Sequence, residues 1–281
     1  MRPSVSPLNV AIVTKDTYYM TNPEPIIESM GHTATTIDDA GIAAYDFSAF
    51  DVILTARMDP TYSADIVAKL RAENITNNKP LIVGLDAYSV TIPAGTGAVS
   101  APATDLGLVT GVDAISAQVT KMNVTDASHY ITRVAGATGD FPMFDTAEFG
   151  GGAIAPWIGT ALADADDTSS DMGSGRAQVI AVETGTSFLD SGTTGARIAM
   201  MHTYMRYQTP TDEYKEMLSA ALDWVAGNDS SDTVARLSTM AASALYADGI
   251  SEASIITFGG SALYMPDAAP ASNKRAIGVI L

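Results

Sequence analysis

The sequence predicts an α/β protein, with a doubly wound, mainly parallel sheet, helices on both faces and a small C-terminal β-rich extension. Three observations support this prediction. Short apolar runs rich in β-branched residues, typical of strands buried on both faces, recur up to Gly84 and again in residues 177–202. Segments with helical periodicity separate the early runs. Beyond residue 228 the composition changes to small residues and short β-prone stretches.

The first part of the sheet is expected in residues 9–56. The apolar run that opens it has no charged residue before Lys15. Asn22 is expected to cap a helix with Pro23 at its first position, and Gly31 is expected to end that helix. Two further apolar runs follow, and a strand, helix and strand in this order imply a right-handed parallel crossover. The predicted strands are residues 9–14, 33–37 and 51–56.

A second helix and a fourth strand come next. Residues 60–75 have an apolar face formed by Ile66, Val67 and Leu70, and the Asn77-Asn78 pair is expected to end this helix. Residues 81–84 (LIVG) are then predicted to be a buried strand. Strands and helices that alternate at this spacing are flavodoxin-like in general character.

The middle of the chain has weaker signals. Residues 122–132 are predicted to form a turn followed by a short extended run, and residues 136–175 show few periodic signals. Strands are expected again at 177–183 and 196–202, with a hairpin connection at 190–195.

A final helix is expected to close the first domain. Thr209 or Thr211 can cap it, and Gly227 is expected to end it. We therefore predict an α/β domain at 1–228 and an extension for packing or assembly at 229–281. The end of the chain is uncharged and β-prone, so we expect this subunit or a neighbour to cover it. The assembly candidates are Ile277, Val279, Ile280 and Leu281.

The composition limits the kinds of partner. A formal net charge of −17 repels phosphate backbones, so we expect no nucleic-acid partner. A solvated acidic surface is the simplest interpretation, and such a charge would also suit a saline habitat or colloidal solubility. No apolar run reaches the length of a membrane span, and no apolar leader precedes the first strand. We expect a virion or cytoplasmic location, no membrane partner and no cofactor.

A ligand crevice is expected where the strand order reverses, outside the carboxyl ends of the parallel strands. Tyrosine, arginine and aspartate side chains there could hold a sugar or another polar ligand. They could equally form a protein contact or a closed cluster of ion pairs. The crevice candidates are Lys15, Asp16, Tyr18, Tyr19, Arg57, Asp86, Tyr88 and His202.

The histidines and acidic residues give weak catalytic signals. Ser89 lacks the G-x-S-x-G context of an exposed nucleophile. His32 is expected to be a surface or cap residue and His129 a packed, hydrogen-bonded one, while His202 is the best functional candidate of the three. A structural role is favoured even for His202. A calcium site is conceivable in the acidic segment, but that segment lacks the glycine and closing glutamate of a calcium loop, so a solvated loop is favoured and no metal is expected. The acidic residues are Asp164, Asp166, Asp167 and Asp171.

An ordered set of motifs resembles the class I glutamine amidotransferase-like fold, and within it the trehalose-utilisation (ThuA-like) domains. The resemblance covers roughly residues 9–228. Catalytic members of that family present a cysteine on the turn after the central strand. Here Asp86 lies near that place, and the chain has no cysteine, so the amidotransferase chemistry is not expected to carry over. The motifs are NVAIVTKD, SMGHTATTIDD, AFDVILTA, PLIVGLDAYS, DLGLVTG, TDASHYIT and LSAALDWVAG.

Two classes of function remain open. The first is a non-catalytic structural or interaction protein that self-associates or joins other proteins of an assembly. Its Ser/Thr/Ala/Gly-rich composition looks similar to that of phage virion proteins such as capsid decoration or tail components. The second is a ThuA-like hydrolase that works through Asp86, His129 or His202, or a sugar-binding module in the same crevice.

Overall fold

The structure is a computed structural model of the whole chain. All elements below belong to one unit, Met1–Gly227. The predicted extension lies outside the described residues except for Asp229, so it stays a prediction. None of the helices in the described part of the chain is long and apolar enough to cross a membrane. The described residues are 7–14, 23–56, 64–85, 98–99, 102–113, 118–145, 148–149, 152–165, 175–203 and 209–229.

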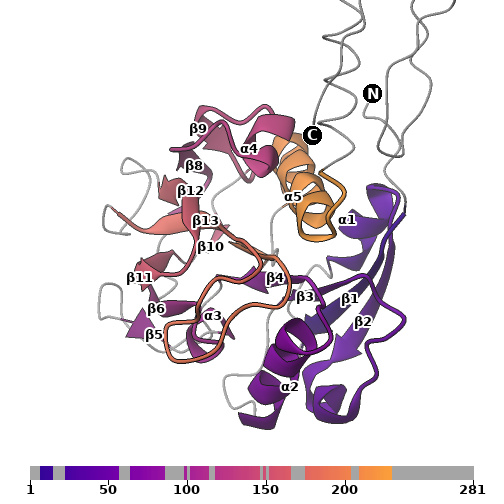
Figure 1. Cartoon of the computed structure of the whole chain (residues 1–281). Coiled ribbons are helices and arrows are strands. Elements are labelled where there is room, and N and C mark those ends of the chain that lie inside the picture. The colour runs from indigo at the N-terminus through magenta and orange to yellow at the C-terminus, as the bar shows by residue number, and fades with distance from the viewer. Residues whose placement is uncertain are drawn as a thin grey trace, which may run out of the picture. The chain divides into compact units, whose positions relative to one another are not determined.

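Five neighbouring strands of the main sheet run parallel, and we call them the parallel half. They stand in the order β2-β1-β3-β4-β14, at the right and centre of Figure 1. The four strands predicted from the N-terminal apolar runs are therefore confirmed as strands, and the structure places them side by side. Their bounds are Thr33–Asp38 (β2), Asn9–Thr14 (β1), Val52–Thr55 (β3), Leu81–Gly84 (β4) and Ile198–Met201 (β14).

The rest of the main sheet is antiparallel, and we call it the antiparallel half. It begins at β13, which pairs antiparallel with β14 as the predicted hairpin requires. Because seven of the twelve strands in this sheet belong to the antiparallel half, the expectation of a mainly parallel sheet was wrong. A separate two-stranded sheet contains β7 (Gln118–Val119) and β10 (Glu148–Phe149). The strands of the antiparallel half are β13 (Ala177–Val182), β11 (Ala153–Trp157), β6 (Val109–Asp113), β5 (Ala98–Val99), β12 (Thr160–Ala165), β8 (Lys121–Val124) and β9 (Gly139–Pro142).

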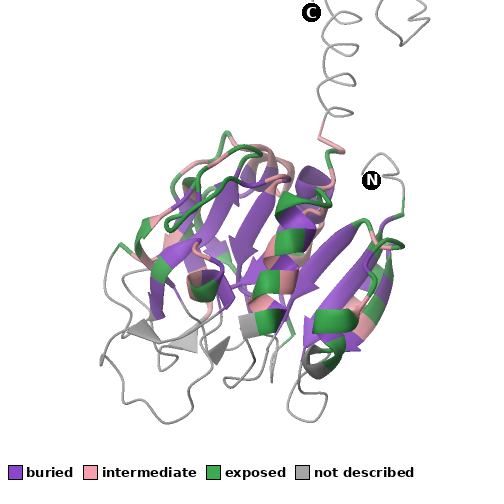
Figure 2. Cartoon of the chain, turned by 60° about the horizontal axis from the view of Figure 1, so that its bottom comes forward, coloured by how far each residue is buried: buried purple, intermediate pink, exposed green. Residues whose placement is uncertain are grey.

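Helices cover both faces of the sheet, as expected. Alternate residues of a strand point to opposite faces, so Val10 and Ile12 of β1 enter one core cluster while Ala11 and Val13 enter the other. Figure 2 shows the strands buried between the layers, with exposed residues on the outer sides of the helices. The first cluster packs against α1 (Glu24–Ser29), α4 (Tyr130–Val134) and α5 (Asp212–Val225), and the second against η1 (Asp39–Ala44), α2 (Ala64–Ile75) and α3 (Pro102–Asp105).

The ends of the long final helix follow the predicted capping. The Thr211 side chain accepts a hydrogen bond from the Tyr214 backbone N–H at 3.1 Å, and Gly227 follows α5 with φ +78°. Gly31 likewise follows α1 with φ +91°. The start of α1 differs from the expectation: its N-cap is Pro23, which has no side-chain donor or acceptor, and Asn22 lies outside the described residues.

Two further expectations for the middle of the chain differ from the structure: the extended run predicted after the turn in residues 122–132 was wrong, and the description of residues 136–175 was incomplete. The run after the turn in residues 122–132 is the helix α4, whose five residues are too few to show helical periodicity. The segment at 136–175 contains β9, β10, β11 and β12. Its longer strands mix buried and exposed small residues without regular alternation, so they gave no strand signal.

Candidate functional site

The candidate site is the edge of the sheet where the parallel strands end. From β1 the chain crosses to β2 on one side, and from β2 it returns to β3 on the other side of β1, so the strand order reverses between β1 and β3. Open α/β sheets bind ligands outside such a reversal. The strands that meet at this edge end at Thr14, Thr55, Gly84 and Met201.

Threonine hydroxyls join the ends of three strands at this edge. The Gly84 N–H donates to Thr55 Oγ1 at 3.0 Å, and the Thr203 hydroxyl donates to the Thr55 carbonyl at 2.9 Å. Thr55 and Thr203 are both buried. Thr55 therefore links β3, β4 and the residues after β14 in a low-dielectric environment, where satisfied hydrogen bonds are strong.

His202 directly follows β14 and is fully buried, at 0% exposure. Its ring stands edge-on to Phe144, with ring centres 5.1 Å apart and an interplanar angle of 75°. The Tyr214 hydroxyl donates to the His202 carbonyl at 2.6 Å. The first turn of α5 thus holds the backbone of His202, while an aromatic side chain from the segment after β9 packs against its ring.

Of the crevice residues predicted from the sequence, the structure describes only His202. The other crevice candidates follow β1, β3 and β4 in the sequence. These three strands run parallel and in register, so all three end at this edge of the sheet. The side chains that could form a crevice with His202 therefore stay predictions. Lys15, Asp16, Tyr18, Tyr19, Arg57, Asp86 and Tyr88, and the assembly candidates Ile277, Val279, Ile280 and Leu281, lie outside the described residues.

The described threonines at this edge hold the strand ends together. The hydroxyls of Thr55 and Thr203 are engaged with backbone groups, and the chain has no cysteine. Within the residues that the structure describes, no three His, Asp or Glu side chains are grouped so that they could hold a metal ion. Asp164 lies in β12, while Asp166, Asp167 and Asp171 are outside the described part.

The other two histidines bind backbone amides. His129 caps α4, with Nδ1 accepting from the Ile131 N–H at 3.3 Å, and its ring lies edge-on to Trp224 at 5.0 Å. This confirms the expected packed histidine. The expected surface position of His32 was wrong: the residue is buried, and its Nδ1 accepts from the Leu8 N–H at 3.2 Å, which extends the β1–β2 contact by one residue.

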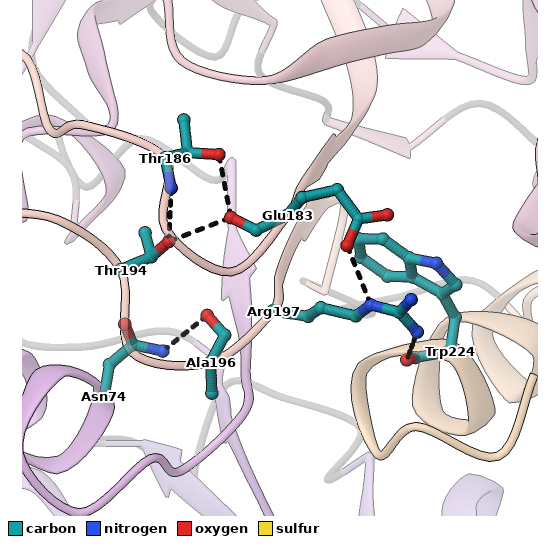
Figure 3. A network of polar contacts seen from close by, with 7 residues as sticks. All are labelled: Asn74, Glu183, Thr186, Thr194, Ala196, Arg197 and Trp224. Carbon is teal, nitrogen blue, oxygen red and sulfur yellow. Dashed lines mark hydrogen bonds and ion pairs between the residues drawn. The ribbon is translucent and has the colours of Figure 1, made fainter.

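A polar network fixes the connection between β13 and β14, at the opposite edge of the sheet (Figure 3). The fully buried Asn74 of α2 donates to the Ala196 carbonyl at 3.1 Å and accepts from the Gly195 N–H at 3.2 Å. Arg197 bonds Glu183 at 2.9 Å and the Trp224 carbonyl at 3.0 Å. No local sequence pattern predicts this network, because Asn74 lies more than 100 residues from its partners Gly195 and Ala196.

Arg71 fastens the tip of the same connection to α2. Its guanidinium makes two hydrogen bonds to the Asp190 carboxylate, at 2.6 and 2.8 Å, and stacks on the Phe188 ring at 4.4 Å. The Arg71 hydrogen bond holds the pKa of Asp190 well below its usual range, and the Ser191 N–H lowers that pKa further. Asp190 is therefore ionised wherever the protein is folded under ordinary conditions.

Comparisons with known proteins show a distant likeness only. No family model and no curated protein matches the sequence. Solved structures that resemble the fold include a Thermoplasma acidophilum protein described as a "putative gmp synthase subunit a protein", at 10% identity and TM-score 0.47, covering 82% of this chain and 100% of that one. Another is SMU.1228c, at 11% identity and TM-score 0.46, covering 78% and 99%. Both likenesses are at low identity and with TM-scores under 0.5, so we take no family, activity, substrate or partner from them.

Proposed function

We propose that this protein is a non-catalytic structural or interaction protein, built as a subunit of a homo-oligomeric assembly. The observation that carries the proposal is the use of the histidines in a chain without cysteine. His32 and His129 accept hydrogen bonds from backbone amides, and His202 is buried against Phe144. Each of the three contributes to packing or capping, whereas a catalytic base must reach the proton that it abstracts.

The C-terminal sequence supports an assembly role. Residues 276–281 (AIGVIL) are uncharged and rich in β-branched residues. Removing such side chains from water is favourable, so association with a neighbouring subunit would stabilise them. The finer proposal is a capsid decoration or tail component of a virion, and it is supported by composition alone.

The solution mass of the full-length chain tests the proposal. We expect light scattering to give a defined oligomer over a range of concentrations. The triple variant Ile277→Asp/Val279→Asp/Ile280→Asp should give the monomer mass, because the association would bury the new carboxylates. The matched control Ala268→Asp/Ala269→Asp/Ala271→Asp adds the same charge nearby and should keep the oligomer. A full-length chain that is monomeric throughout, or a triple variant of unchanged mass, would contradict the proposal.

A second candidate function is a ThuA-like hydrolase or a sugar-binding module at the carboxyl edge of the strands. It is favoured by the place of His202 directly after β14, where the N–H of Leu85, the residue before Asp86 in the sequence, donates to the Met201 carbonyl at 3.0 Å. An enzyme of this kind should hydrolyse a glycoside or ester, and both Asp86→Asn and His202→Ala should abolish turnover while the far-ultraviolet circular dichroism spectrum is kept. Full activity in both variants would exclude this site.

A further inference from the structure

The chain has far more carboxylates than cations to neutralise them. It contains 32 Asp and Glu but only 15 Lys and Arg, so 17 carboxylates remain even if every cation pairs with one. Several of the described cations are already engaged in ion pairs, such as Lys69–Glu73, Arg71–Asp190 and Lys215–Asp212, at 2.6 to 2.8 Å. The surplus negative charge is therefore a property of the whole chain and does not depend on how individual pairs form.

Most carboxylates whose burial the structure describes lie at the surface. Within that set, only Glu73 and Asp223 are buried, and Glu73 pairs with Lys69. The other carboxylates of the set are exposed or half-buried, on helices of both faces and on the connections between strands. Folding holds these groups at the surface of a compact body, whereas the unfolded chain can separate them.

Salt weakens both the attraction within ion pairs and the repulsion among the surplus carboxylates, and these two effects act on stability in opposite directions. It weakens the surface ion pairs, each of which contributes little. It also screens repulsion among the surplus carboxylates, since the Debye length falls from about 10 Å at 0.1 M to about 3 Å at 1 M. Because the unpaired charges outnumber the pairs that the cations can form, the screening of repulsion dominates.

We propose that the folded state of this protein depends on ionic strength, and that its surface is suited to molar monovalent salt. At low salt, repulsion among the surplus carboxylates opposes the compact state. Potassium or sodium ions at molar concentration remove most of that repulsion without binding at a defined site. This inference concerns folding of the single chain and does not require the proposed assembly.

Thermal unfolding of the full chain in 0.05 to 3 M KCl tests the proposal, followed by far-ultraviolet circular dichroism at low protein concentration. We expect the Tm to rise by roughly 10 °C or more across this range. The variant Glu28→Lys/Asp145→Lys replaces two exposed carboxylates and changes the net charge from −17 to −13. It should have a higher Tm at low salt and a smaller rise with KCl.

A matched variant separates charge from other effects of salt. Glu28→Gln/Asp145→Asn changes the same positions but shifts the net charge only to −15, so its Tm should rise by an intermediate amount. A Tm that is flat or falls with KCl would overturn the proposal. An equal rise in all three proteins would also overturn it, because salt would then be acting on apolar burial instead of on charge.

Discussion

The parallel and antiparallel halves of the sheet are stabilised in different ways. Every residue of β3 and β4 is buried, and their pairing with neighbours is continuous. In the antiparallel half, β12 mixes buried and exposed residues, and its pairing with β13 shifts register twice. The central strands β3 and β4 of the parallel half therefore depend mainly on continuous apolar burial, whereas β12 in the antiparallel half combines partial burial with irregular pairing.

The two halves nonetheless share one core on the face covered by α5. Leu54 of β3 and Leu162 of β12 belong to the same buried cluster. The polar network around Asn74 fixes the connection between β13 and β14, the strands at which the halves meet. This arrangement predicts that the halves unfold together, although they are built differently.

The largest effect is expected from equal truncations in the two halves. Leu54→Ala and Leu162→Ala each remove a fully buried leucine, with exposures of 1% and 0%. Each should reduce the free energy of unfolding by about 2–5 kcal/mol through lost burial and a residual cavity. Urea titration followed by tryptophan fluorescence and circular dichroism measures the loss.

The same titration tests whether the halves are coupled. One of the two tryptophans, Trp157, lies in β11 and the other, Trp224, in α5. Coincident transitions by both methods in both variants would support a shared core. A separate early transition in Leu162→Ala alone would show that the antiparallel half unfolds independently.

A smaller loss is expected from crowding the contact between α2 and the β13–β14 connection. In Gly195→Ala the new Cβ would lie 2.4 Å from the Asn74 carbonyl oxygen and 2.6 Å from that of Ile75. The backbone must move, at a cost of about 3 kcal/mol in the free energy of unfolding. Gly41→Ala is the control, because its Cβ meets nothing within 4 Å. Equal stability of the two variants would show that the backbone of the β13–β14 connection can move at little cost in free energy.

Removing the Asn74 side chain should reduce the free energy of unfolding somewhat less than Gly195→Ala does. Asn74→Ala leaves the Ala196 and Lys79 carbonyls and the Gly195 N–H without their Asn74 partner, so we expect a loss of about 2 kcal/mol. Asn77 is exposed and donates to Glu73, so Asn77→Ala is a matched control. It should reduce the free energy of unfolding by less than about 1 kcal/mol. A negligible loss at Asn74 would mean that the network does not stabilise the connection.

The smallest effect is expected at the exposed ion pair between Asp190 and Arg71. Because folding lowers the Asp190 pKa, the pair stabilises the protein above pH 4, near the ordinary aspartate value of about 3.9. That contribution is lost as the pH falls toward the folded pKa. The Tm difference between wild type and Asp190→Asn should therefore shrink below pH 4.

A control distinguishes this pair from general acid effects. Asp145 is exposed and forms no ion pair with the described residues, so Asp145→Asn is a suitable comparison. A Tm difference for Asp190→Asn that stays constant from pH 6 to pH 2 would refute the assigned role of the pair.

The contrast between the halves also explains what the sequence could predict. Most strands of the parallel half, such as β3 and β4, are short apolar runs, and α5 has a cap, a stripe and a terminating glycine, so these elements were recognisable locally. The strands at 153–165 consist largely of small residues with mixed exposure and carry no such signal. Helix α4 is too short for periodicity, and its cap is a histidine instead of one of the usual small polar residues.

For the candidate site, topology was predictable and contacts were not. The rule that parallel strands end at one edge placed His202 there correctly. The burial of His202 depends on contacts with Phe144 and Tyr214, which belong to separate segments of the chain. No local sequence pattern predicts such contacts. The position of His32 was missed for the same reason, since its partner Leu8 is 24 residues away.

The place of β14 in the sheet has a consequence for how the protein is made. Although β14 is the last strand along the described chain, it lies in the middle of the sheet, between β4 and β13. A ribosome must therefore translate residue 201 before either half can be joined to the other. Until then both neighbours present an open strand edge, so the growing chain is most exposed to aggregation just before synthesis of the domain is complete.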